Sequence, residues 1–275
     1  MKPLTPRIVG IINVTPDSFS DGGAYLDPTD AVRRAEDLLT AGADIVEIGG
    51  DSTRPGSTCV GSEIEWARIE PSIRALAGRC ALAVDTHHAF VAERALDLGA
   101  QLVNDVSAGS DPRMFEVVAR KGAAIVLMFS RCSAPHLFGP APAGDIVRTI
   151  NTFLERRTRA ALRAGVPPER IIHDTGMGGF VSPDADASWE ILRRIAEITP
   201  GGGGIMLGSS RKGFLKTATE RSPAERDPAS ALTGVLVARA LRDRAVRLYL
   251  RVHNVTEQKR LLDVFTKENQ YINNP

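Results

Sequence analysis

The chain has 275 residues, of which 43% are hydrophobic and 24% are charged, and its formal net charge is +1. This length suits one large domain, and the apolar content is enough for a sizeable core, which argues against disorder. The near-neutral charge provides no long-range field for nucleic acid or a membrane, so any bound anion must be held by a local site. We expect a single domain over residues 1–275, with a polar tail from about residue 266.

The three cysteines, Cys59, Cys80 and Cys132, form no CxxC pair. A sparse, odd set of cysteines argues against a disulfide framework and a zinc knuckle. The first apolar run is too short for a signal peptide, and the stretch 123–129 is far below the ~20 residues of a membrane span. The sequence therefore predicts a cytoplasmic protein. No HxH, HExxH or carboxylate cluster indicates a tightly held transition metal.

Short apolar runs alternate with amphipathic segments along the whole chain. The runs are typical of buried parallel strands and cover residues 8–12, 44–48, 81–84, 102–103, 124–128, 170–173, 204–207 and 246–250. The segments of helical period cover residues 31–39, 63–76, 89–98, 113–120, 145–164, 188–198, 228–241 and 256–265. Eight strand–helix pairs predict an α/β fold, a single-domain (β/α)8 TIM barrel. A doubly wound open sheet is the alternative.

Unusual polar clusters come directly after the predicted strands, on the face where barrel enzymes build their active sites. Each has a structural explanation on its own. Asp85 and Asp174 could cap helices, and Asn104 could lie in a turn. Lys212 and Arg211 could be a solvated pair, His253 could be a packed histidine, and we expect His87 and His88 to be structural. The collection of these residues on one rim nevertheless favours a binding site.

Three of these side chains suit one kind of ligand. Asp85, Asn104 and Asp174 are short and carry oxygen acceptors, which match the donor-rich edge of a 2-amino-4-oxo heterocycle such as a pterin or guanine.

The remaining polar residues suit a phosphate group. Arg251, His253 and Lys212, with backbone N–H groups of glycine-rich turns, could hold a di- or polyphosphate. Asn13 offers a neutral oxygen to Mg²⁺, whose other ligands would be water and phosphate oxygens. The pattern predicts a barrel enzyme that handles a phosphorylated heterocycle.

At these residues the sequence resembles the dihydropteroate synthases, the folate-pathway transferases that sulfonamides block. The resemblance extends from Gly10 to about Leu262. It rests on residues 13–23 (NVTPDSFSDGG), 49–56 (GGDSTRPG), 84–86 (VDT), 104–106 (NDV), 210–214 (SRKGF) and 251–255 (RVHNV).

The resemblance implies an SN1-like transfer of a pterinylmethyl group from 7,8-dihydropterin-6-ylmethyl diphosphate to p-aminobenzoate, with Mg²⁺ as cofactor. It implies a catalytic set of Asp85, Asp174, Lys212 and Arg251, and a pterin-binding set of Asp85, Asn104, Met128, Asp174 and Lys212. It implies a diphosphate set of Asn13, Arg251 and His253, with Asn13 also at the metal. The p-aminobenzoate set is Phe19, Thr53, Arg54, Pro55 and Gly213. Members of the family are usually homodimers.

Several positions depart from the usual family pattern. Thr175 replaces a proline, Phe129 replaces a histidine, and Asn254 replaces an aspartate. Gly179 replaces an aromatic residue, for which Phe180 could substitute after a one-residue shift. Gly213 replaces a serine that contacts the p-aminobenzoate carboxylate. Because these changes gather near the second substrate, we expect its binding, or the discrimination against inhibitors, to differ from the standard enzyme.

Two other functions remain open. One is a pterin-binding relative that is catalytically silent or uses another arylamine, with or without insensitivity to sulfonamides. The other is a methyltetrahydrofolate-dependent methyltransferase, which the Arg251–His253 pair and the STRP segment disfavour.

Overall fold

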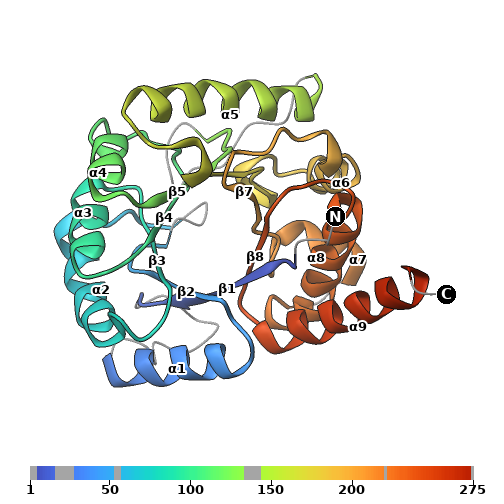
Figure 1. Ribbon diagram of the computed structural model, residues 1–275, viewed down its shortest axis with the longest axis horizontal. Coiled ribbons are helices and arrows are strands. Elements are labelled where there is room, and N and C mark those ends of the chain that lie inside the picture. Colours follow the sequence, from blue (N-terminus) through green and yellow to red (C-terminus); the bar gives the residue numbers. More distant parts are fainter. Residues whose placement is uncertain (1–4, 16–27, 53–56, 133–143, 220–221, 274–275) are drawn as a thin grey trace.

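A computed structural model describes residues 5–15, 28–52, 57–132, 144–219 and 222–273. Within these ranges, eight parallel strands close into a barrel in chain order, and β8 pairs with β1 (Figure 1). The strands are β1 (Arg7–Asn13), β2 (Ile45–Gly49), β3 (Leu82–Asp85), β4 (Leu102–Asp105), β5 (Ala124–Met128), β6 (Ile171–Asp174), β7 (Gly204–Leu207) and β8 (Leu248–Val252). The predicted (β/α)8 barrel is confirmed, and closure of the sheet excludes the doubly wound alternative.

A ring of helices surrounds the barrel (Figure 1). They are α1 (Pro28–Thr40), α2 (Ser62–Leu76), α3 (Ala89–Asp97), α4 (Met114–Lys121), α5 (Ile146–Arg163), α6 (Ala185–Arg193), α7 (Lys216–Thr219), α8 (Asp227–Leu241) and α9 (Val255–Asn273). Most ends lie within a few residues of the predicted ones. The exception is α9, which continues through most of the predicted polar tail. Its polar residues Lys267, Glu268 and Gln270 have good helix propensity, and no proline or glycine interrupts them.

The interior of the barrel follows from the alternation of side chains along each strand. One inward-facing layer takes an apolar residue from every strand: Val9, Ile45, Ala83, Leu102, Val126, Ile172, Met206 and Tyr249. Residues two positions further along a strand point to the same face. The next layer is therefore Ile11, Glu47, Asp85, Asn104, Met128, Asp174, Gly208 and Arg251. Five of these eight residues are polar or charged, so most of the polar side chains inside the barrel lie toward the carboxyl ends of its strands.

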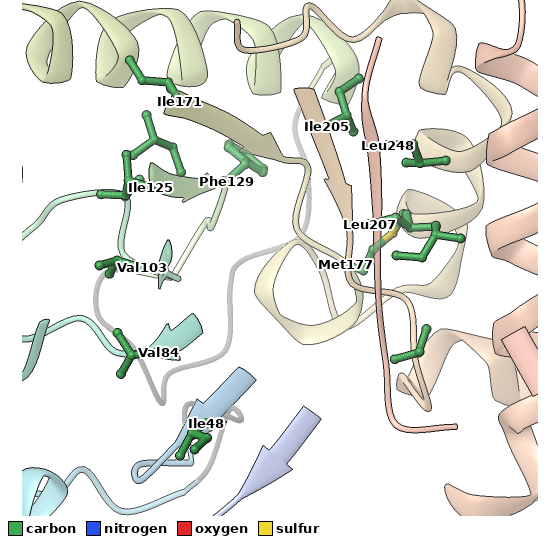
Figure 2. Packing of buried hydrophobic residues seen from close by; sticks show 14 of the residues in the cluster. Ile48, Val84, Val103, Ile125, Phe129, Ile171, Met177, Ile205, Leu207 and Leu248 are labelled. Carbon is green, nitrogen blue, oxygen red and sulfur yellow. The ribbon is translucent and has the colours of Figure 1, made fainter. Parts of the chain in front are cut away.

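The outward faces of the strands pack against the helices. Buried members of this outer layer, among them Val84, Val103 and Ile125, stand beside their strands in Figure 2. Phe129 belongs to the same layer: it is 3% exposed, and its ring meets that of Phe153 on α5 edge to face, with centroids 5.3 Å apart. Phe129, which stands in place of the family's common histidine, therefore packs between barrel and helices and is not among the residues that line the cavity.

The three cysteines are free thiols, as their spacing predicted. Among the described residues, no helix combines the length and the apolar character that crossing a membrane requires.

Candidate active site

A cavity of about 710 Å³ lies at the carboxyl ends of the strands. This volume is in the usual range for small-molecule sites. It is lined by every predicted site residue within the described ranges: Asn13, Asp85, Asn104, Met128, Asp174, Lys212, Gly213, Arg251 and His253. The other predicted residues, Phe19, Thr53, Arg54 and Pro55, lie outside the described residues.

Asp85 and Asn104 are neighbours in the register of β3 and β4. Oδ2 of Asp85 accepts a hydrogen bond from Nη2 of Arg251 at 2.7 Å, and Nδ2 of Asn104 donates to Glu47 at 3.0 Å. The second oxygen of each residue, Oδ1, is buried and has no hydrogen-bond partner in the described part of the chain. Buried acceptors without a donor are costly. Two side by side in a cavity point to a ligand that presents N–H groups.

Neither Asp85 nor Asp174 caps a helix. The N-cap of α3 is His88, and the first amide of that helix donates to Asp111 at 2.9 Å. Oδ1 of Asp174 instead accepts the backbone N–H of Gly176 at 2.8 Å, which turns the chain sharply after β6. The structural explanations of these two aspartates are therefore wrong, apart from this local turn.

Burial controls the protonation of both carboxyl groups. It raises the pKa of Asp174 to about 6, although the Gly176 amide and Lys212 lower it. Burial raises the pKa of Asp85 to about 7, with Arg251 acting against the increase and Glu47 adding to it. Both groups therefore change charge near neutral pH, where a ligand with N–H donors would favour the ionised form.

Glu47 is a site residue that the sequence reasoning missed. It is 0% exposed in the middle of β2, and Oε1 accepts from Nε of Arg251 at 2.7 Å while Oε2 accepts from Asn104. One carboxylate thus orients a cation and an amide that both line the cavity. The sequence feature that could have indicated Glu47 is its position as the one acidic residue of the otherwise apolar run 45–49. It lies two positions beyond Ile45, which belongs to the apolar layer.

Lys212 and Phe180 form one side of the cavity. Nζ of Lys212 lies 4.7 Å from the centroid of the Phe180 ring, a cation–π arrangement. Phe180 is 7% exposed and packs in a small apolar cluster with Val106 and Met128. Gly179 leaves the position of the family's aromatic residue without a side chain, and Phe180 supplies a ring one residue later, as the predicted shift requires.

Arg211 diverges from Lys212 and anchors the segment after β7. Its backbone is left-handed, with φ at 59°, and its guanidinium binds both carboxylate oxygens of Asp227 at 2.7 and 2.8 Å. Nδ2 of Asn254 donates to the same carboxylate at 3.1 Å. An aspartate at position 254 would place a second negative charge against Asp227. The departure at Asn254 therefore belongs to this anchor, and Arg211 and Lys212 are no solvated pair.

Thr175 and Gly213, two further departures from the usual family pattern, have different surroundings. Thr175 is 0% exposed and precedes Gly176, whose φ is +64°. A Cβ on Gly176 would lie 2.1 Å from the carbonyl oxygen of Phe129, so only glycine fits there. Gly213 is the opposite case, because an added Cβ would meet no atom of the described residues within 4 Å. The space for the family's common serine is therefore present.

The diphosphate candidates share one side of the cavity. Nδ1 of His253 lies 2.9 Å from Oγ of Ser210, and the hydroxyl also accepts the His253 backbone N–H at 3.2 Å. Ser210 is a second residue whose role the sequence reasoning did not assign. Burial lowers the pKa of Arg251, but the carboxylates of Glu47 and Asp85 more than offset this and raise it, so Arg251 remains cationic.

Comparison with known proteins identifies the family. Residues 9–253 match the family described as pterin binding enzyme. The chain belongs to this family. It is 38% identical over 241 residues to the dihydropteroate synthase of Mycobacterium leprae (strain TN), a match that covers 84% of each chain.

Solved structures of the family have the same barrel. The dihydropteroate synthase of Burkholderia cenocepacia, complexed with 7,8-dihydropteroate, is 28% identical with a TM-score of 0.86, covering 100% of this chain and 99% of the other. That of Xanthomonas albilineans, with 4-aminobenzoic acid, is 35% identical with a TM-score of 0.84, covering 96% and 93%.

Proposed function

We propose that this chain is a dihydropteroate synthase, which condenses 7,8-dihydropterin-6-ylmethyl diphosphate with p-aminobenzoate to 7,8-dihydropteroate and diphosphate. The observation that carries the proposal is the pair of buried acceptors, Oδ1 of Asp85 and Oδ1 of Asn104, beside Asp174 at the base of the cavity. A pterin presents its ring N–H and amino groups along one edge, and such an edge would satisfy these acceptors. Membership of the family and the similarity to synthases support the same function.

The pterin would lie on the polar layer of the barrel. Asp85, Asn104 and Asp174 accept its N–H groups, and Lys212 donates to its carbonyl oxygen. Met128 and Phe180 provide the apolar contacts for the ring. A ligand with donors on one edge and an acceptor beside them is thereby bound in one orientation, with its methylene group toward the cavity mouth.

The diphosphate would lie against Arg251, His253 and Asn13. Arg251 provides a cation that Glu47 holds in place, and Ser210 orients His253. A neutral amide oxygen from Asn13 fits a hard cation that takes most of its ligands from phosphate and water. When bound, Mg²⁺ would neutralise charge on the departing diphosphate.

The reaction needs stabilised charge more than a strong base. The bond between the methylene carbon and the diphosphate oxygen breaks, and the electron pair leaves with diphosphate. Ionised Asp174 and Asp85 stabilise the positive charge that develops on the pterin methylene group. The neutral arylamine then forms the carbon–nitrogen bond and loses a proton to the phosphate or to water. Phe19, Thr53, Arg54, Pro55 and Gly213 remain the predicted contacts of p-aminobenzoate.

The test is diphosphate release and dihydropteroate formation by the purified chain with Mg²⁺, with and without p-aminobenzoate. The proposal predicts that dihydropteroate forms only when p-aminobenzoate is present. Binding of the pterin diphosphate without product would favour the catalytically silent relative or another arylamine. No pterin binding at all would overturn the assignment of the cavity.

We also propose a cytoplasmic homodimer. Leu232 and Leu236, one helical turn apart on α8, are 52% and 51% exposed, so a second subunit could bury them together. Three free thiols suit a reducing compartment. Sedimentation of the wild type should give a dimer, and Leu236→Arg should shift it toward the monomer. A wild-type monomer at micromolar concentration would refute the dimer.

A further inference from the structure

Three side chains of different chemistry converge beside the cavity, which one of them, Asp51, also lines. Asp51 follows β2, Cys59 precedes α2, and His87 follows β3. One potential ligand atom from each lies within 4.8 Å of the other two. We propose that Asp51, Cys59 and His87 bind a Zn²⁺ ion.

The donor set selects the metal. A thiolate, an imidazole and a carboxylate are the three zinc ligands that proteins use, and three protein ligands leave a fourth position for water. Mg²⁺ prefers oxygen donors and does not compete for a thiolate. The site is therefore distinct in chemistry from the diphosphate side of the cavity, where Asn13 offers oxygen alone.

The geometry needs only a small adjustment. Zinc bonds of about 2.0–2.3 Å in a tetrahedron place ligand atoms roughly 3.3–3.8 Å apart. Asp51 is 7% exposed, with both carboxylate oxygens buried, so one ligand is fixed by its surroundings. His87 is half-buried, whereas Cys59 is exposed, and rotation of its side chain can bring the sulfur closer. The cluster thus has a buried carboxylate, a half-buried imidazole and an exposed thiol that can move toward them.

The local charge also favours a cation. Glu65, 0% exposed on α2, lies near the cluster and pairs through Oε2 with Nδ1 of His88 at 2.7 Å. Burial and the carboxylates of Asp51 and Glu65 raise the pKa of the Cys59 thiol. A divalent ion would reverse this effect, because it stabilises the thiolate and offsets the clustered negative charge.

The site would connect two segments that border the catalytic cavity. Asp51 also lines that cavity, and His87 follows Asp85 by two residues. A bound ion would fix the segment after β2 against the segment after β3. The sequence contains no local spacing motif for this arrangement, because Asp51 and Cys59 lie in the connection between β2 and α2 whereas His87 lies in the connection between β3 and α3.

The test uses the full chain, stripped with a chelator and without pterin, titrated with Zn²⁺ against a chromophoric chelator and separately with Co²⁺. We expect one ion per chain and a thiolate-to-cobalt charge-transfer band in the near ultraviolet. Cys59→Ser should abolish the band and weaken Zn²⁺ binding roughly a hundredfold, and His87→Ala should weaken it similarly. Excess Mg²⁺ should not displace the zinc.

Cys80→Ser and Cys132→Ser are the matched controls, since each removes a thiol outside the cluster. Both should bind Zn²⁺ like the wild type. Alkylation of Cys59 in the wild type gives a readout that no folding defect can imitate, and Zn²⁺ should protect this thiol. Absence of stoichiometric binding, equal weakening in the Cys59 and Cys80 variants, or a Co²⁺ band that survives Cys59→Ser would overturn the proposal.

Discussion

Glu47 and Arg251 are joined inside the barrel by a hydrogen bond of 2.7 Å between Oε1 and Nε. The same guanidinium reaches Asp85 at 2.7 Å, and the same carboxylate accepts from Asn104 at 3.0 Å. A proposed pterin contact and a proposed diphosphate contact are thus coupled through one buried acidic residue. Because Arg251 and Asn104 both line the cavity, we expect a change at Glu47 to affect both ends of the proposed substrate.

Glu47→Gln tests this coupling. Loss of the negative charge weakens the hold on Arg251 and removes one of the influences that raise the pKa of Asp85. We expect kcat/KM to fall about tenfold, the acidic limb of its pH profile to move to lower pH, and stability to fall by about 1–3 kcal/mol. The measurements are a pH–rate profile and urea unfolding. The exposed Glu63→Gln on α2 is the control, and identical pH profiles for the two variants would contradict the coupling.

Asp174 makes stability depend on pH in a defined direction. Its pKa in the folded protein, about 6, lies above the ordinary value of 3.8, so the folded state holds the proton more tightly. The resulting stabilisation is fully present below pH ~4 and is lost as the pH rises through about 6. Relative to Asp174→Asn, the wild type should therefore lose on the order of 1–3 kcal/mol between pH 4.5 and 7.5.

Urea unfolding at those two pH values measures the effect. Asp186→Asn, an exposed position on α6, should show no such pH dependence relative to the wild type. A stability difference between wild type and Asp174→Asn that is constant over this range would show that the carboxyl group ionises normally.

The Arg211–Asp227 pair should support the position of Lys212. Asp227→Asn leaves a mostly buried guanidinium without its carboxylate, which we expect to cost about 2–4 kcal/mol and to raise KM for the pterin diphosphate. The matched control is Asp243→Asn, since Asp243 pairs with Arg242 at the surface with its side chain 90% exposed. This exposed pair should contribute less than about 1 kcal/mol. Equal effects of the two substitutions would argue against an anchoring role.

Gly213→Ser tests whether the open space at this position weakens the second substrate. A Cβ at this position meets no described atom within 4 Å, and a serine hydroxyl beyond it can donate to the carboxylate of p-aminobenzoate. KM for p-aminobenzoate should fall about three- to tenfold, consistent with one hydrogen bond to a charged group. Gly213→Ala fills the same space without a donor and should have no such effect. If the alanine variant gains equally, the hydroxyl is not responsible.

The alternation of short apolar runs with amphipathic segments predicts the barrel, and polar residues follow each run. It also predicts many of the polar residues that line the cavity, since Asp85, Asn104 and Asp174 end strands β3, β4 and β6 or lie within one residue of the end. The role of Glu47 was not predicted, because this residue lies inside a strand that is otherwise apolar. Only its position in the layers of the folded barrel shows that its side chain points into the barrel. The Asp51–Cys59–His87 cluster was not predicted from the sequence, because its members come together only in the folded chain.

The most direct test of the central claim, that the acceptor side chains at the base of the cavity, Asp174 among them, hold a pterin, is calorimetric titration of the wild type and Asp174→Asn with the pterin diphosphate. In the variant, an amide N–H₂ faces the ligand's own donors while the turn to Gly176 can still form through the remaining oxygen. The account predicts tight wild-type binding, a loss of about ten- to a hundredfold in Asp174→Asn, and no change in Asp186→Asn. Equal affinity for all three proteins would contradict it.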